Sequence, residues 1–469
     1  MSELRLVAPA VVVWAAAALV IVHGWGLAAV LSCGAAAYLC VVRQEGLAIL
    51  TAGLGLISAA VAKVRVSIAR SWDFTGGVVG AVAGEPKELT GGTWLVLVRP
   101  EGYPDAVPVF ARDLPDGVVT GAIVSSQGRV GESTIPGVGS ATISGAVEVL
   151  HGPTGVAALA GEVRANFVAA VHAFVGRDSV GLIPGMVLGD TSAQTVEEKQ
   201  EYIATGLSHL SAVSGSNCMY VAAAALFVAR MARLGLRAQL VCAGVALMVY
   251  AALVGPQPSV LRATVSGLVG LVAIISSSRA EPIHALCLSV VGLVLVDSGL
   301  AVDYAFALSV AATAGIIALS PVIYRAIAYV CVPIRAPDLL LRVVAVAIAA
   351  DMVTAPIIAA MVGRVSLVSV LANVAAAPVT GLITVLGFVA AVLAQIPVLD
   401  FLAAPVLWVI HPLTWWIRNV ARVLAGVGWA TVPAKPTSVC LIYGWILAAI
   451  LAPRQLRGMR PKRRCRGAE

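Results

Sequence analysis

Charged side chains are scarce in this chain of 469 residues. Asp, Glu, Lys and Arg together occupy 12% of the positions, whereas 60% of the residues are hydrophobic. Water-soluble domains carry about 25% charged residues, so this chain has too few of them to cover a surface in water. The composition excludes a soluble globular protein and favours a protein of the membrane.

Motifs for nucleotide and metal chemistry are also missing. No Gly-Lys pair occurs, which excludes the phosphate-binding loop of ATPases. The eight cysteines show no zinc-type or redox spacing, and the six histidines are too scattered for a local metal motif. We therefore expect a protein that is not an enzyme and that needs no cofactor.

Long apolar runs are the main positive feature. Many approach the roughly 17–25 residues that cross a bilayer as a helix. The first leads almost directly into the second, which is typical of a retained anchor rather than a cleaved signal. The expected spans are 6–22, 25–42, 46–62, 203–228, 238–254, 259–276, 283–298, 301–320, 339–361, 366–394, 401–424 and 437–452. This pattern predicts a polytopic α-helical membrane protein.

Proline and glycine interrupt several of the later runs. The interruptions are Pro356, Gly363, Pro378, Gly381 and Pro405. Broken helices are tolerated in lipid only where protein or a water-filled cavity satisfies the freed backbone groups. Their number favours a channel or transporter over a simple anchor.

Residues 63–155 differ in character from the apolar runs on either side. Gly and Pro punctuate short runs rich in β-branched residues, which predicts a small all-β barrel or sandwich. The expected strands are 77–82, 93–99, 106–110, 117–124 and 140–150. Residues 72–152 contain nine acidic and four basic side chains, so charge alone gives this region no nucleic-acid surface.

An amphipathic helix is predicted at 161–177, within a segment covering 156–180. Val163, Phe167 and Val171 recur on one face and polar residues lie between them. A helix of this kind lies at a membrane surface or packs on the β region, and the sequence leaves both open.

The densest polar cluster lies at the start of the second membrane region, 181–453. Its members are Gly189, Asp190, His209, Ser214, Gly215 and Asn217, followed by an apolar helix. Polar groups inside a membrane require partners, so these residues are functional candidates. The alternative is a kinked helix whose Ser and Asn side chains bond to its own backbone.

Four charged residues are further candidates. Arg262 begins an apolar span, where it either pairs with a carboxylate or phosphate inside the bundle or extends to the interface. Asp297 and Asp303 are expected to cap helix ends. Asp351 is flanked by apolar residues and is expected to be buried.

The charge distribution bears on orientation. Seven Lys and Arg residues lie in the tail 454–469, so the positive-inside rule predicts a cytoplasmic C-terminus, with anionic lipid as a compatible contact. Three crossings from a cytoplasmic N-terminus place the β region outside the cytoplasm. Lys63, Arg65 and Arg70, directly after the third apolar run, argue against that placement.

Four blocks of the second membrane region resemble the ComEC family of competence proteins. The blocks are Gly189-Asp190 with His209-Leu210 and Ser214-Gly215-Ser216-Asn217; Pro258-Ser-Val-Leu-Arg262-Ala; Phe306-Ala-Leu308-Ser309; and Val365-Ser-Leu with Ala372-Asn373 and Ala377-Pro378. They occur in the family's order across about 180–390.

The resemblance implies both a fold and a function. The β region would be an OB-like domain outside the cytoplasm, and 181–453 would be a channel that passes single-stranded DNA across a bacterial cytoplasmic membrane during natural transformation. The implied partners are an extracytoplasmic DNA receptor, a cytoplasmic ATPase and a separate nuclease. Residues expected to line or shape the path are Gly189, Asp190, His209, Ser214, Gly215, Asn217, Arg262, Ser309, Asn373 and Pro378.

Two departures from the family pattern are visible. Many members carry a metallo-β-lactamase-like nuclease domain after the membrane region, and the sequence here has no such motif. The family commonly has Gln where this chain has Asp351. We expect Asp351 either to face away from the path or to be neutralised by Arg262 or Arg364.

Two other functions are alternatives to DNA transport. An intramembrane hydrolase would use Ser214 with His209, but on one helix residues five apart lie about 140° from each other. A small-solute transporter or envelope protein unrelated to DNA is the main alternative. Internal repetition would favour a transporter, and none is evident.

Overall fold

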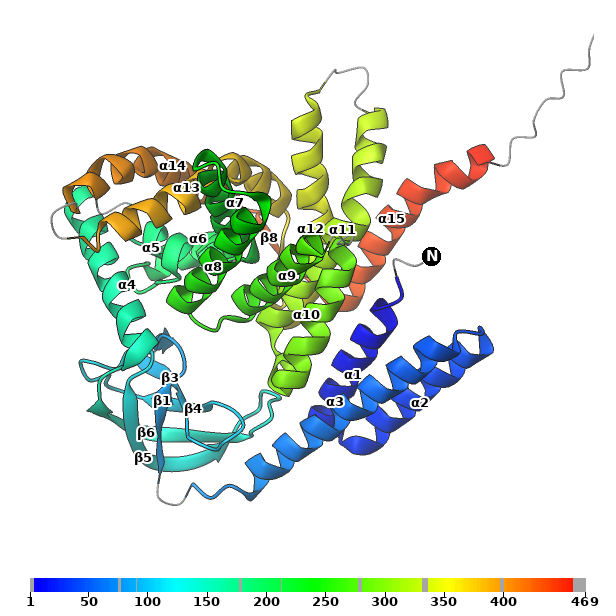
Figure 1. Cartoon of the computed structure of the whole chain (residues 1–469), viewed down its shortest axis with the longest axis horizontal. Helices are drawn as coiled ribbons and strands as arrows, with labels where there is room; N and C mark the ends of the chain where they lie inside the picture. Colours follow the sequence, from blue (N-terminus) through cyan, green and yellow to red (C-terminus); the bar gives the residue numbers. More distant parts are fainter. Residues whose placement is uncertain are drawn as a thin grey trace, which may run out of the picture.

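The computed structural model describes residues 4–74, 77–89, 91–176, 179–211, 213–276, 281–330, 336–396 and 400–458. Apolar helices make up most of it, and a small β domain is inserted between α3 and α4 (Figure 1). Within these residues six helices are long and apolar enough to cross a membrane. They are α3 (Glu45–Ser71), α8 (Leu236–Val254), α9 (Pro258–Ile275), α11 (Tyr304–Val330), α12 (Asp338–Val362) and α13 (Ser369–Leu393). From residue 459 onward, the predicted basic tail lies outside the described residues.

The N-terminal cluster consists of α1 (Val7–His23), α2 (Trp25–Val41) and α3, joined by the short connections that the sequence predicted. Small side chains such as Ala59 fill its core, which lets helix backbones approach closely. The hydroxyl of Ser58 on α3 donates to the carbonyl of Val13 on α1 at 2.8 Å. The predicted end at residue 62 is wrong, because α3 continues to Ser71. Its basic residues therefore lie on the helix itself.

The β domain is a closed barrel. Its strands are β1 (Val78–Val82), β2 (Lys87–Leu89), β3 (Thr93–Arg99), β4 (Val107–Ala111), β5 (Ile123–Glu132) and β6 (Ala141–His151). The ring runs β1-β3-β4-β6-β5 and closes because β1 pairs with both β3 and β5. All pairs are antiparallel except β4 with β6, and β2 extends the sheet beside β3. Of the two predicted architectures, the structure therefore has the barrel.

Hydrophobic alternation explains which strands could be predicted. In β3 and β4 the valines point inward, as Val96 and Val109 show, and both strands lie within a residue of their predicted ranges. The predicted strand at 117–124 is wrong, because turns occupy most of it and β5 begins at Ile123. The exposed β2 was missed because it has no buried positions to give a pattern.

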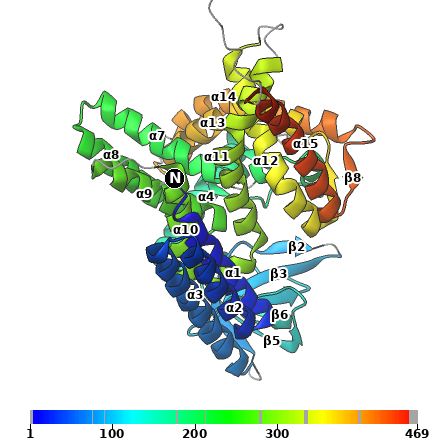
Figure 2. The same cartoon turned by 90° about the vertical axis from the view of Figure 1, so that its right-hand side faces the viewer.

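Two charged contacts attach the barrel to the helices. Arg65 on α3 pairs with Asp297 at 2.9 Å and also donates to the carbonyl of Pro104 in the β3–β4 loop. On another side of the barrel, Glu85 in the β1–β2 loop pairs with Arg164 of α4 (Gly155–Phe174) at 2.8 Å. Figure 2 shows the strands of the barrel below the helices α13 and α14.

The apolar face of α4 has a different neighbour from either one predicted. Phe167 and Val171 are fully buried in a core shared with α13 and α14 (Ala403–Ala425). The indole of Trp408 on α14 donates to the carbonyl of Phe174 at 3.1 Å. The interpretations as a membrane-surface helix or as a helix packed on the β region are therefore wrong for this face, which belongs to the helical domain.

The remaining helices complete that domain. They are α5 (Leu182–Leu188), α6 (Val196–Ala204), α7 (Gly215–Met231), α10 (Pro282–Val296) and α15 (Pro436–Gly458). The predicted span 203–228 is wrong at its start, because the Gly- and Ser-rich segment after Ala204 breaks the helix until Gly215. A short ladder pairs β7 (Arg364–Ser366) with β8 (Thr431–Pro433).

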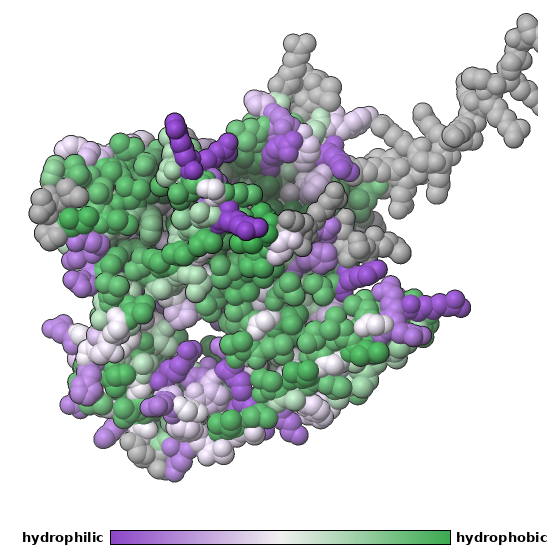
Figure 3. Space-filling view, in the orientation of Figure 1, coloured by the Kyte–Doolittle hydropathy of each residue, from purple (hydrophilic) through white to green (hydrophobic). Residues whose placement is uncertain are grey.

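Three of the predicted interruptions lie in the interior of helices. Pro356 is in α12, and Pro378 and Gly381 are in α13, whereas Gly363 follows the end of α12 and Pro405 lies in the first turn of α14. Near Pro378, the indole of Trp416 on α14 donates to the carbonyl of Ala375 at 2.9 Å, so a neighbouring helix provides a donor beside the break. Figure 3 shows hydrophobic residues over much of the helical surface, with hydrophilic residues gathered on the barrel and on the opposite tips.

Candidate functional site

The Ser-Gly-Ser-Asn segment forms the beginning of α7 and contacts α5. Ser214 is the N-cap of α7, and its hydroxyl donates to the side-chain oxygen of Asn217 at 3.1 Å. Asn217 is buried, and its Nδ2 donates to the carbonyl of Met186 in α5 at 2.8 Å. Gly189 ends α5 in a left-handed conformation, with φ of 82°. Asn217 therefore ties two helices together, which a helix bonding only to its own backbone would not do.

Arg262 lies beside this segment. It is in the second turn of α9, and its side chain is inside the protein, since the residue is only 7% exposed. The interpretation as an arginine extending to the interface is therefore wrong. Its Nε donates to the hydroxyl of Ser309 on α11 at 2.8 Å. A Cβ atom at Gly215 would lie 2.6 Å from its Nη2, so a larger residue at this position would displace the guanidinium. The site thus joins α7, α9 and α11.

The positive charge of Arg262 is not balanced by an acidic side chain in this site. None of the ion pairs between described residues includes Arg262. Its hydrogen-bond partner Ser309 is neutral. Burying a guanidinium without a counter-charge is unfavourable, so an anion at this position would be stabilising.

Asp190 and His209 lie outside the site formed by Ser214, Asn217, Arg262 and Ser309. The carboxylate of Asp190 accepts from the backbone N–H and the hydroxyl of Ser192, at 2.9 and 2.5 Å. The ring of His209 is exposed and bonds to the carbonyl of Gly206 at 3.1 Å. The structure therefore does not bring these two predicted path residues to Arg262.

The hydrolase alternative lacks its required contact. His209 is in a short 3-10 turn, Ser208–Leu210, and bonds to Gly206, whereas Ser214 bonds to Ser216 and Asn217. The two residues are not on one helix, and each has another partner. In the part of the chain that the structure describes, no three His, Cys, Asp or Glu side chains gather as metal ligands.

A second polar group joins α12, α13 and α15. The carboxylate of Asp351 accepts from the hydroxyl of Ser369 and, at 2.5 Å, from the hydroxyl of Tyr443. Asn373 donates from Nδ2 to the carbonyl of Ser369 at 2.8 Å. Pro378 is exposed, further along α13. Asn373 thus bonds to its own helix and indirectly supports the contact to Asp351.

The predicted neutralisation of Asp351 by an arginine is wrong. Arg262 bonds to Ser309, and Arg364 bonds to the hydroxyl of Thr431 at 2.9 Å. Two hydroxyl groups take the place of a cation at Asp351. The alternative expectation was that the carboxylate of Asp351 faces away from the predicted path. This agrees with its bonds to Ser369 on α13 and Tyr443 on α15.

The predicted caps are confirmed. Asp297 accepts from the backbone N–H of Gly299 at 3.0 Å, and Asp303 accepts from that of Phe306 at 2.7 Å, at the start of α11. Asp297 also holds Arg65, so one carboxylate both caps a turn and anchors the barrel.

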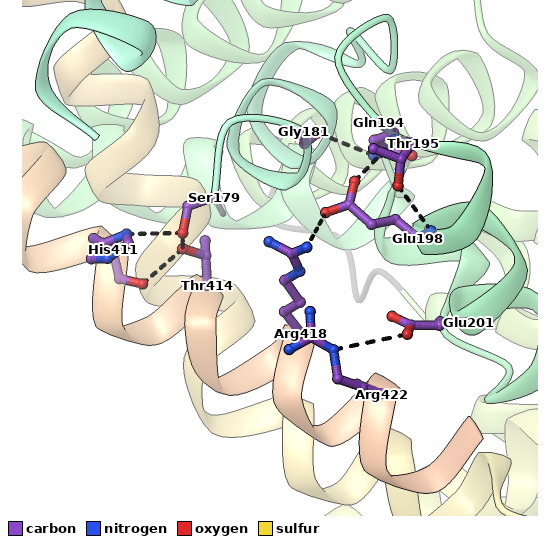
Figure 4. A network of polar contacts seen from close by, with 10 residues as sticks. All are labelled: Ser179, Gly181, Gln194, Thr195, Glu198, Glu201, His411, Thr414, Arg418 and Arg422. Atoms are coloured by element: carbon purple, nitrogen blue, oxygen red, sulfur yellow. Dashed lines mark hydrogen bonds and ion pairs between the residues drawn. The ribbon is translucent and has the colours of Figure 1, made fainter. Parts of the chain in front are cut away.

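A buried ion pair between α6 and α14 was missed by the sequence analysis. Glu198 pairs with Arg418 at 3.2 Å, with side chains only 10% and 16% exposed, and Glu198 also forms a capping box with Thr195 (Figure 4). One turn on, Glu201 and Arg422 are 3.9 Å apart. The only sequence signals were two arginines in the apolar run 401–424, and nothing in that run identifies partners so distant in the chain.

Hydrogen-bonded side chains continue the network beside the ion pair. Ser179 bonds to His411 Nδ1 at 2.9 Å, and Thr414 donates to the hydroxyl of Ser179 at 3.1 Å (Figure 4). These contacts fasten the segment before α5 to α14.

Comparison with known proteins agrees with the resemblance seen in the sequence. A family model described as Competence protein matches residues 186–457, which is more than half of the chain and contains all ten candidate residues. No curated protein and no solved structure matches the chain at a significant level. The helical fold, the six apolar helices and the family match together establish that this chain is a multi-pass membrane protein belonging to the ComEC-type competence protein family.

Proposed function

We propose that this protein forms the path by which single-stranded DNA crosses a bacterial cytoplasmic membrane during natural transformation. Membership of the competence family supports a role in DNA uptake. The observation that carries the proposal is Arg262, a buried cation in the helical domain whose hydrogen-bond partner is neutral. The protein acts as a translocator, since moving the strand requires no bond to be made or cut.

The physical argument rests on phosphate. Each nucleotide brings one negative charge, which an apolar bundle does not tolerate without a cation. A guanidinium has five N–H donors in a planar fork that fits two phosphate oxygens. Ser309 occupies Nε and fixes the plane of the group, which leaves the terminal nitrogens for an anion. Charge-assisted bonds of this kind are among the strongest in proteins.

The proposal places the barrel outside the cytoplasm, as an OB-like domain. A small closed barrel of five strands is typical of that fold. Arg230, Arg233 and Arg237 gather around the α7–α8 turn, away from the barrel in Figure 2, and basic turns favour the cytoplasmic side. A cysteine at Thr134 is then expected to react with an impermeant maleimide in intact cells. Reaction only after lysis would contradict this placement.

Of the three basic residues at the end of α3, Arg70 is exposed, whereas the other two do not oppose it. Arg65 is engaged by Asp297, and Lys63 lies over the ring of Trp25, 5.5 Å from its centroid. The positive-inside rule concerns charges free to remain in the cytoplasm. These two charges have partners within the protein.

Transformation frequency tests the proposal. A competent strain lacking the gene is complemented with wild type, Arg262→Ala or Arg262→Lys, and membrane levels are compared by immunoblot. We expect Arg262→Ala to be present in the membrane and to transform no better than the deletion strain. Arg262→Lys is expected to be intermediate, because lysine keeps the charge but loses the planar fork.

Arg342→Ala is the matched control. Arg342 is an exposed arginine that pairs with Asp338 near the start of α12, and its loss is expected to leave transformation unchanged. Wild-type transformation by Arg262→Ala would remove this residue from the path. Unchanged transformation after deletion would overturn DNA transport altogether and favour a small-solute transporter.

Three partners belong to the proposal. They are an extracytoplasmic DNA receptor, a cytoplasmic ATPase and a nuclease for the discarded strand. Crosslinking in competent cells, followed by mass spectrometry of the purified protein, tests for them. Recovery of none of the three would contradict this part of the proposal.

A further inference from the structure

Asp351 is a carboxyl group at mid-height in a helix long and apolar enough to cross the membrane. At a rise of ~1.5 Å per residue it lies about 20 Å from Asp338 and about 17 Å from Val362, the two ends of α12. The hydrocarbon layer of a bilayer is about 30 Å thick. Both ends of the helix therefore reach the interfaces while Asp351 remains well inside the layer. Ionisable residues at this depth are rare and mark sites of function.

The partners of this carboxyl group are hydroxyls. Ser369 and Tyr443 each bond to one of its two oxygens. A hydroxyl can donate or accept, whereas an ammonium or guanidinium can only donate. When Asp351 is ionised, both hydroxyls donate to it. When it is protonated, one of them turns and accepts its O–H. The site therefore satisfies both protonation states with the same three side chains.

Several charged and titratable groups on or near the elements packed against α12 have other partners, and Arg325 on α11 and Cys440 on α15 are exposed. On α11, Tyr324 bonds to Asp338 at the far end of α12, where Arg342 also pairs with it. The guanidinium of Arg364 on β7 bonds to Thr431.

On α13, the groups near Asp351 are the neutral Ser369 and Asn373, and α15 contributes Tyr443. His209, near the start of α13, bonds to the carbonyl of Gly206. Among the ion pairs between described residues, none fixes Asp351 in its ionised form.

We propose that Asp351 is a proton-binding site inside the membrane, at which the protein takes up and releases a proton with Ser369 and Tyr443 as its hydrogen-bond partners. The site is separate from Arg262 and requires no DNA. Its proposal therefore does not depend on the proposed function.

Labelling with a hydrophobic carbodiimide tests the proposal. The reagent adds to a protonated carboxyl in an apolar medium: the carboxyl oxygen bonds to the central carbon, the acid proton passes to a nitrogen, and rearrangement leaves a stable N-acylurea. Membranes containing the full chain are labelled across a range of pH without DNA, and the peptides are read by mass spectrometry. We expect labelling of Asp351 that declines as pH rises, and none in Asp351→Asn, which retains a hydrogen-bonding side chain of the same size.

Two comparisons complete the test. Asp338 is an exposed carboxyl on the same helix, paired with Arg342, and is expected to stay unlabelled by the apolar reagent. Tyr443→Phe removes one donor to the ionised form, so its half-labelling is expected at a higher pH. Absence of Asp351 labelling at every pH, or labelling that does not change with pH, would overturn the proposal. Infrared difference spectra of the carboxyl C=O stretch, wild type against Asp351→Asn, provide a second readout that needs no chemical reaction.

Discussion

Arg262 and Arg418 are both largely enclosed in the helical domain but have different partners, and their expected roles differ accordingly. Arg418 pairs with Glu198, whereas the hydrogen-bond partner of Arg262 is the hydroxyl of Ser309. A buried pair is satisfied within the protein, and removing one partner leaves an uncompensated charge. We therefore expect a structural role for Arg418, whereas the substrate contact of Arg262 is the proposal made above.

Replacing Glu198 tests the structural half of this distinction. Glu198→Gln is expected to destabilise the protein by about 3–5 kcal/mol, the usual result of breaking one side of a buried pair. Glu201→Gln is the control and is expected to lose less than ~1 kcal/mol. Its partner Arg422 is 3.9 Å away and 56% exposed. Thermal unfolding of the purified variants in one detergent measures both. Equal losses in the two variants would show that burial of the first pair has no energetic consequence.

Single residues were predictable where a charged or polar side chain lies in an apolar run. Arg262, Asn217 and Asp351 could be found in this way, because lipid makes each polar side chain conspicuous. Their partners could not be assigned. Met186 and Tyr443 look like ordinary helix residues in the sequence, and the resemblance that singled out Ser309 did not link it to Arg262. Pairing across helices depends on packing that no local pattern records.

At the scale of elements, alternation identified strands and long apolar runs identified helices. The start of α7 was misplaced, because Ile203 before Gly206 and Leu207 after it keep that segment apolar while its glycine and serines end the helix. The partner of α4 was also misjudged. An amphipathic pattern identifies the apolar face of a helix, but it does not identify what covers that face.

The barrel depends on close approach between β5 and β6. Gly128 and Gly145 lie opposite each other, and a Cβ at Gly128 would be 2.2 Å from the carbonyl oxygen of Ser144. Gly128→Ala is therefore expected to force the strands apart and to lower the unfolding temperature of the purified protein. Gly84→Ala, where a Cβ would meet nothing within 4 Å, is the control and is expected to behave as wild type. Equal unfolding temperatures in the two variants would contradict this reading of the barrel.

For the whole molecule, the attachment of the barrel to the helices is the main long-range feature. Glu85 and Asp105 lie at the two contacts, and burial is the first cause that raises the pKa of each carboxyl. Arg164 opposes the shift at Glu85, and the backbone N–H of Gly139 opposes it at Asp105. Both carboxyl groups therefore bind a proton more tightly in the folded protein than in the unfolded chain.

The sign of the pH dependence follows from this shift. As pH falls from neutral through the raised pKa of Glu85 towards its ordinary value of 4.5, the folded state gains protons first and becomes more stable. This gain is lost again as pH rises. Glu85→Gln removes its share of the effect, so the unfolding temperature of the variant is expected to change less with pH than that of wild type. Parallel curves for the two proteins would show that Glu85 does not contribute.

The β7–β8 ladder gives the molecule a further property. It pairs Ser366 with Thr431, so the chain that leaves at the end of α12 returns to the same point before α15 begins. The helices between them, α13 and α14, form an arm with a single base. Its base is therefore fixed where α12 and α15 meet. Its buried face packs in a core shared with α4 and α5, and the Glu198–Arg418 pair also holds it to α6.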